Sequence, residues 1–168
     1  MQPRIDYAKT APGVAKAMLG LEEYVYHTGL ERGLLELVRL RASLINGCAY
    51  CVDMHTKVAH SLGETEQRLY SVSLWSEAPY YTERERAALA WTEAVTRVSV
   101  DQVPDDVYET ARQHFPDKEL IDLTLAIVAI NGWNRLAVAF RTVPGTFQVG
   151  GRPPDGPAVP ASEIKATR

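Results

Sequence analysis

The chain has 168 residues, of which 46% are hydrophobic and 23% are charged, and its formal net charge is −3 at neutral pH. This length and composition are typical of one globular domain with an ordinary hydrophobic core. The charges are spread along the chain without a basic block, so we expect no nucleic-acid partner and no anionic membrane surface.

Apolar residues recur at helical spacing through the first half of the chain. The pattern predicts helices over residues 12–27 and 31–46, a third from about Cys48 to Gly63, and a short fourth within residues 63–72. Asn46 and Gly47 both tolerate the left-handed conformation, so this pair is expected to end the second helix and begin a tight turn.

The second half of the chain shows three more helical segments. Residues 82–98 begin with Thr82 three residues before Glu85, which is a capping-box pattern. Pro104 is expected to begin a helix that runs to about His114, and a long last helix follows over residues 117–142. We find no convincing strand, so the sequence predicts an all-α domain of about seven helices over residues 1–143.

The predicted last helix is apolar almost all round before Asn131. It has the length of a membrane span, but residues 120–140 include Asp122, Asn131, Asn134 and Arg135, which are costly at membrane depth. We therefore expect no membrane partner and a helix buried by its own domain or by another subunit. Gly132 within this helix suggests a close packing contact, and we interpret Trp133 as a packing or interface residue.

The two ends of the chain differ in amino-acid composition. Residues 144–168 hold five of the ten prolines and four of the eleven glycines, so we expect an irregular or partly disordered C-terminal arm. The first 18 residues have no continuous apolar core of the kind found in secretory signals. We therefore expect a cytoplasmic protein, in which a cysteine pair more often serves catalysis or metal binding than structure.

The segment NGCAYCVDMH, residues 46–55, contains both cysteines of the chain. If the third helix begins at Cys48, then Cys48 and Cys51 lie at its amino end, where the helix dipole and unpaired N–H groups favour the thiolate. His55 lies one turn further along the same face. A neutral imidazole at that position could accept or return the thiol proton near neutral pH.

Glu36 is expected to approach this cluster because the turn at Asn46 and Gly47 folds the second and third helices into an antiparallel hairpin. At about 1.5 Å per residue, Glu36 is roughly 15 Å from the turn along one helix, and His55 is roughly 11–12 Å from it along the other. The spacing therefore predicts a line of proton-carrying groups from Glu36 through His55 to Cys51.

Four other interpretations of these residues are open. The cysteines can be inert core thiols, or half of a zinc site that would need His55 and Glu36 as further ligands. His55 alone is often a satisfied core histidine, and Glu36 alone is most often on a solvated helix face. The other histidines, His27, His60 and His114, have no comparable partners in the sequence.

Glu36, the CAYC segment and His55, with eleven and three residues between them, resemble the alkylhydroperoxidase AhpD-like branch of the carboxymuconolactone decarboxylase superfamily. The segment AINGWNRLAVAFRTVPG also resembles the C-terminal part of short members. The resemblance implies a helical fold that assembles into trimers or hexamers, and thiol peroxidase activity. It implies that Cys51 attacks the peroxide, Cys48 resolves the intermediate, and Glu36 and His55 relay protons.

The position just before Cys51 is Tyr50, where the characterised peroxidase has an additional relay histidine. The family members that decarboxylate lactones lack the cysteine pair, which argues against that activity for this chain. The sequence therefore predicts a cytosolic dithiol peroxidase with a hydroperoxide substrate and an external dithiol reductant, for which the resemblance suggests a lipoyl-type group. It indicates no cofactor and no metal. The alternative is a non-catalytic helical oligomer that senses redox state or binds a metal or partner.

Overall fold

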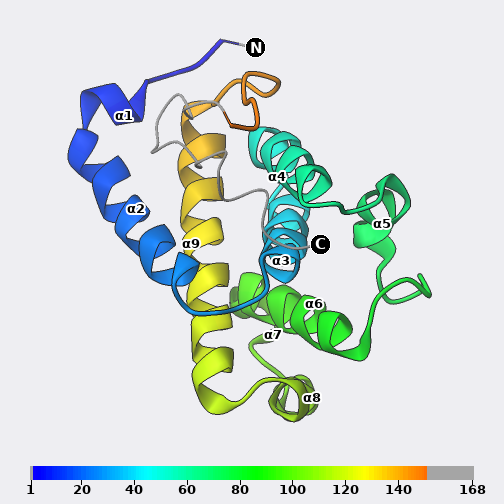
Figure 1. Ribbon diagram of the computed structural model, residues 1–168. Coiled ribbons are helices and arrows are strands. Elements are labelled where there is room, and N and C mark those ends of the chain that lie inside the picture. The colour runs from blue at the N-terminus through cyan, green and yellow to red at the C-terminus, as the bar shows by residue number, and fades with distance from the viewer. Residues whose placement is uncertain (1, 151–168) are drawn as a thin grey trace.

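The computed structural model describes residues 2–150, and within them the chain is all-helical, as the sequence predicts (Figure 1). The nine α-helices and one 3₁₀ turn of this part are α1 (Tyr7–Thr10), α2 (Pro12–Tyr26), α3 (Arg32–Ile45), α4 (Ala49–Ser61), α5 (Glu66–Ser71), η1 (Val72–Leu74), α6 (Glu83–Thr96), α7 (Val98–Asp101), α8 (Asp105–His114) and α9 (Asp117–Phe140). The helices absent from the prediction are α1 and α7, which have four residues each and are too short to show a periodic pattern.

Two hydrophobic clusters form the core, and α3 contributes to both of them. One cluster joins α3 to α2, α6, α8 and α9, with Val38, Phe115 and Ile127 almost completely buried. The other joins α3 to α4, α5, η1 and α6 through residues such as Leu37 and Leu89. Because α3 is covered on opposite sides, a charged side chain on it is withdrawn from water unless it lies on a narrow exposed strip.

The predicted helix ends are set by local hydrogen bonds. Thr82 and Glu85 form the reciprocal capping box at the start of α6, and Thr65 caps α5 by accepting from the Arg68 N–H group. Gly47 has a φ of +66°, which a glycine adopts without steric cost and which turns the chain from α3 into α4.

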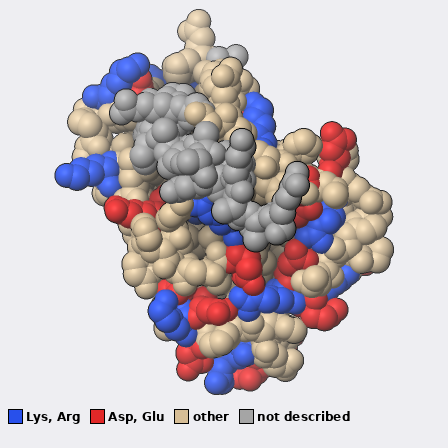
Figure 2. Space-filling view, in the orientation of Figure 1, with Lys and Arg blue, Asp and Glu red and all other residues tan. Residues whose placement is uncertain are grey.

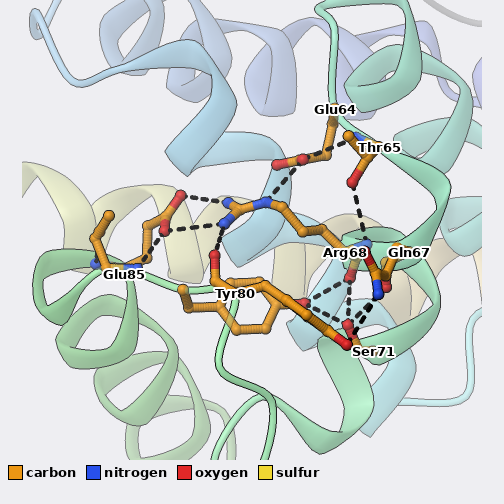
Figure 3. A network of polar contacts seen from close by, with 9 residues as sticks. Glu64, Thr65, Gln67, Arg68, Ser71, Tyr80 and Glu85 are labelled. Carbon is orange, nitrogen blue, oxygen red and sulfur yellow. Dashed lines mark hydrogen bonds and ion pairs between the residues drawn. The ribbon is translucent and has the colours of Figure 1, made fainter.

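A polar network fastens the region around α5 to the start of α6 (Figure 3). The Arg68 guanidinium donates to Glu64 at 2.8 Å, to Glu85 at 2.5 Å and to the Tyr80 carbonyl. Glu85 is also a member of the α6 capping box, so one carboxylate serves both helices. Elsewhere on the face drawn in Figure 2, acidic and basic side chains are interspersed, in keeping with the even charge pattern of the sequence.

Helix α9 lies along the centre of the bundle beside α2 and α3 (Figure 1). By length and composition it is the one helix of the described chain that could cross a membrane, but Leu123, Ala126 and Ile127 in its first half are completely buried by other helices. Ile121 and Val128 remain 68% and 50% exposed, so the bundle does not cover α9 on all sides.

The chain after α9 returns to α4. The Gly145 N–H group donates to Asp53 at 3.1 Å, Lys57 donates to the Phe147 carbonyl at 3.1 Å, and the Phe147 side chain is buried. Residues 144–150 are therefore irregular, and Gly145 and Phe147 fasten the segment to α4. The predicted division at residue 143 stays a prediction, and residues 151–168 of the expected C-terminal arm lie outside the described residues.

Candidate active site

The two cysteines lie at the amino end of α4, immediately after the α3–α4 turn. Cys48 is the N-cap residue, and its sulfur accepts a hydrogen bond from the Cys51 N–H group at 3.3 Å. The Cys48 N–H group donates to the Ser43 carbonyl of α3 at 3.0 Å, which fixes the cap to the preceding helix. Both sulfurs therefore occupy the helix terminus that favours thiolate in a reduced pair.

In this structure the two cysteines are joined by a disulfide across a Cα–Cα distance of 5.3 Å. That separation lies within the usual range for disulfides, so the helix terminus accommodates the oxidised pair. Both residues are buried, and they pack against Ala137 of α9 with the partly buried Tyr50 beside them.

Glu36 of α3 and His55 of α4 form a buried hydrogen bond across the hairpin. The distance from Glu36 Oε2 to His55 Nδ1 is 2.8 Å, and the residues are 4% and 6% exposed. The hairpin therefore brings together the carboxylate and the imidazole, which the sequence predicted to lie at similar distances from the turn between the two helices. An ionised carboxylate can only accept, so Nδ1 donates, and a neutral ring then has its acceptor at Nε2. His55 Nε2 is buried and has no hydrogen-bond partner among the described residues.

The carboxyl group of Glu36 is ionised at neutral pH. Burial raises its pKa, but the charges of His55 and Arg39 and their hydrogen bonds outweigh burial and hold the pKa at about 2, below the ordinary 4.5. Arg39 Nη1 donates to Glu36 Oε1 at 2.6 Å. The carboxylate is therefore held by a cation on one oxygen and by the imidazole on the other.

The series of hydrogen bonds continues beyond the site residues that the sequence predicts. Arg39 Nη2 donates to Glu22 Oε2 of α2 at 2.6 Å, and Trp133 Nε1 of α9 donates to Glu22 Oε1 at 3.1 Å. Arg39 could have been found, because it follows Glu36 by three residues on the same helix face. Glu22 and Trp133 could not, because only the packing of α2 and α9 brings them to Arg39.

Comparison with known proteins identifies the family. The sequence model of the Carboxymuconolactone decarboxylase family matches residues 12–94. The chain is 40% identical to the uncharacterized protein YdfG of Bacillus subtilis over 139 residues, which is 83% of this chain and 95% of YdfG. A crystal structure from Agrobacterium tumefaciens has a TM-score of 0.84 at 49% identity, covering 87% of this chain and all of that one. That protein is of unknown function and is proposed to be the antioxidant defence protein AhpD.

The chain is an AhpD-like member of the carboxymuconolactone decarboxylase family. The same fold also occurs in proteins of much lower sequence identity. The debrominase Bmp8 has a TM-score of 0.74 at 19% identity, over 82% of this chain and 74% of Bmp8, which is a likeness of fold alone. The scaffold of this chain therefore also occurs in a debrominase.

In this AhpD-like protein the turn before the cysteines is fixed to α9 by amides. Asn46 Nδ2 donates to the side-chain oxygens of Asn131 and Asn134, both at 2.9 Å, and Asn134 Nδ2 donates to Ser43 Oγ at 3.1 Å. Asn134 is therefore part of a buried polar network. The close contact expected at Gly132 is with Met18 of α2, whose methyl carbon would lie 2.8 Å from an added Cβ.

The part of the chain that the structure describes contains no ligand set of the kind that a metal site would need. Among those residues, no three or more His, Cys, Asp or Glu side chains are grouped so that they could hold a metal ion. The predicted site residues Glu36, Cys48, Cys51 and His55 are instead found in two covalent or hydrogen-bonded pairs on adjoining helices.

Proposed function

We propose that this AhpD-like protein is a thiol-dependent peroxidase that reduces hydroperoxides through a dithiol–disulfide cycle of Cys48 and Cys51. The observation that carries the proposal is the buried Glu36–His55 hydrogen bond, because His55 follows Cys51 by one turn of α4. A carboxylate that fixes Nδ1 leaves Nε2 as the ring position able to exchange a proton with a thiol.

In the proposed cycle, His55 accepts the proton of the Cys51 thiol, and the thiolate attacks the terminal oxygen of the hydroperoxide. The O–O bond breaks, the alcohol leaves with a proton returned through His55, and Cys51 becomes a sulfenic acid. The Cys48 sulfur then attacks the Cys51 sulfur and forms the disulfide, and the proton of the Cys48 thiol passes to the leaving hydroxide, which departs as water. An external dithiol supplies two electrons by exchange and restores both thiols.

Further parts of the proposal concern the partners. The chemistry requires a two-electron reductant, and the family resemblance favours a dithiol of the lipoyl type, in the cytoplasm. We also propose a homo-oligomer, because Ile121 and Val128 leave an apolar strip of α9 exposed. The family resemblance favours a trimer or hexamer.

The test is turnover of cumene hydroperoxide and hydrogen peroxide by the reduced protein with dihydrolipoamide as donor. We expect Cys51→Ser to abolish turnover, and Cys48→Ser to abolish it while leaving a sulfenic acid on Cys51 that dimedone traps. His55→Gln should slow turnover by roughly 10²-fold or more, the usual size of a lost acid–base group. The matched control is His60→Gln, which removes an exposed histidine of the same helix and should match the parent. Parental rates in both cysteine variants would refute the proposal.

The disulfide between Cys48 and Cys51 also fits a second candidate, a redox sensor, which needs oxidation without rapid turnover. Thiol titration with metal analysis separates the candidates. Two fast-reacting thiols that disappear with one equivalent of peroxide and return with dithiol, cycle after cycle, support the enzyme. Stoichiometric oxidation without turnover supports the sensor, and blocked thiols with stoichiometric zinc support the metal-binding alternative.

A further inference from the structure

Two carboxylates share the single guanidinium of Arg39. Its Nη1 atom bonds to Glu36 and its Nη2 atom bonds to Glu22, each at 2.6 Å. The three groups together carry one net negative charge when all are ionised. The pairing of Arg39 with Glu22 therefore leaves the charge of Glu36 available to a protonated imidazole at His55, 2.8 Å from the other oxygen of Glu36.

Without the negative charge of Glu22, the net charge of this buried group of side chains changes. Glu36 and Arg39 would then form a neutral pair, and a proton on His55 would leave one net positive charge largely withdrawn from water. An uncompensated charge in such a place is costly. Glu22 thus favours the protonated form of His55 although the contacts join the two residues only through Arg39 and Glu36.

Glu22 is held where this effect requires it. Its second oxygen accepts from the Trp133 indole at 3.1 Å, so α9 fixes the carboxylate of α2 against the guanidinium of α3. Three other carboxylates on the helices around α3 and α4 are paired with cations of their own. Glu93 of α6 pairs with Arg41 and Arg97, Asp122 of α9 with Lys118, and Asp53 of α4 with Lys57.

We propose that Glu22 and Arg39 are positioning residues for the Glu36–His55 pair: Arg39 holds the carboxylate, and Glu22, fixed by Trp133, neutralises Arg39 so that Glu36 can stabilise an imidazolium. This inference rests on the proposed function only in assigning that imidazolium to the peroxide cycle. The electrostatic claim itself concerns the folded protein in any redox state.

The chain contains a closely matched control cluster. Glu93 accepts from Arg41 of α3 at 2.8 Å and from the Trp75 indole, and its side chain is 25% exposed against 26% for Glu22. Both clusters are therefore half-buried Glu–Arg–Trp sets that include one arginine of α3. Glu93→Gln removes the same charge as Glu22→Gln from a cluster in which Arg41 takes the place of Arg39. Glutamine keeps the length and an acceptor oxygen in both cases.

The experiment is a proton NMR titration of the imidazole signals in the oxidised protein, where the disulfide prevents the thiols from titrating. The chain has four histidines, so the His55 signal is assigned by its loss in His55→Gln. We expect Glu22→Gln to lower the midpoint of the His55 titration by about one pH unit, the scale of a lost opposite charge near a titrating group. Glu93→Gln should match the parent, and far-UV circular dichroism confirms that both variants are folded.

A midpoint that is unchanged in Glu22→Gln, or lowered equally in Glu93→Gln, would overturn the inference. The outcome is independent of peroxidase activity. If the midpoint falls as expected while the parent does not turn over hydroperoxides, the inference stands and the proposed function fails. If the parent is an active peroxidase and the midpoint does not move, the function stands and the inference fails.

Discussion

The ionised Glu36 carboxylate makes a quantitative prediction about stability and pH. The perturbation is Glu36→Gln, which removes the titrating group but keeps its shape. At pH 6 we expect the variant to be less stable by about 3 kcal/mol, because it leaves His55 without its buried counter-charge and Arg39 with Glu22 as its remaining carboxylate partner. This stability gap should then shrink as the pH falls.

The size of that change follows from the pKa of Glu36, which is lowered from 4.5 to about 2 in the folded protein. A folded-state pKa below the unfolded value means that the unfolded chain binds the proton first as the pH falls. The stabilisation is therefore complete above pH 4.5 and is lost as the pH falls through the folded value of about 2. At 1.36 kcal/mol per unit the full effect is about 3 kcal/mol, of which about 2 kcal/mol is lost between pH 6 and pH 3.

The assay is urea denaturation at pH 6, 4.5 and 3, followed by circular dichroism at 222 nm, with the disulfide intact and the protein concentration held constant. Carboxylates that do not contact Arg39 or His55 have the same surroundings in both proteins, so their titration cancels in the difference. The parent-minus-variant free energy of unfolding should fall by about 2 kcal/mol between pH 6 and pH 3. A difference that stays constant across this range, or grows at low pH, would refute the assignment of Glu36 as a buried ion stabilised by Arg39 and His55.

Three further predictions concern the fold and the surface. Thr82→Ala should lower the free energy of unfolding by about 1 kcal/mol in urea denaturation, because it removes the N-cap of α6; an unchanged denaturation midpoint would contradict it. Gly47→Ala should lower the free energy of unfolding by about 1–2 kcal/mol, since φ at this position is +66°. It should also slow re-formation of the disulfide by displacing Cys48. Stability equal to that of the parent would show that the turn tolerates another residue. Val128→Glu, at an exposed apolar position of α9, should reduce the sedimentation coefficient if α9 joins subunits, whereas a parent that sediments as a monomer at micromolar concentration would remove the basis for the proposed assembly.

The sequence by itself determined the helices and the local placement of the sulfurs. Signals such as the Thr82 capping box and the Gly47 turn act over three or four residues, so they are readable without the fold. The position of Cys48 at the N-cap of α4 follows from the same short-range rules. The proximity of Glu36 and His55 could also be predicted. In a tight hairpin, two residues at similar distances from the turn along their helices lie beside each other.

The tertiary structure alone decided how Glu36 is charged and held. Glu22 is 17 residues from Arg39 in the sequence, and Trp133 is 111 residues from Glu22, so no local pattern connects them. Their meeting depends on α2, α3 and α9 packing side by side, which is the outcome of burying apolar surface throughout the bundle. Burial also turned Glu36 from an apparent surface residue into a buried ion, since exposure is a property of the surrounding helices and not of the residue.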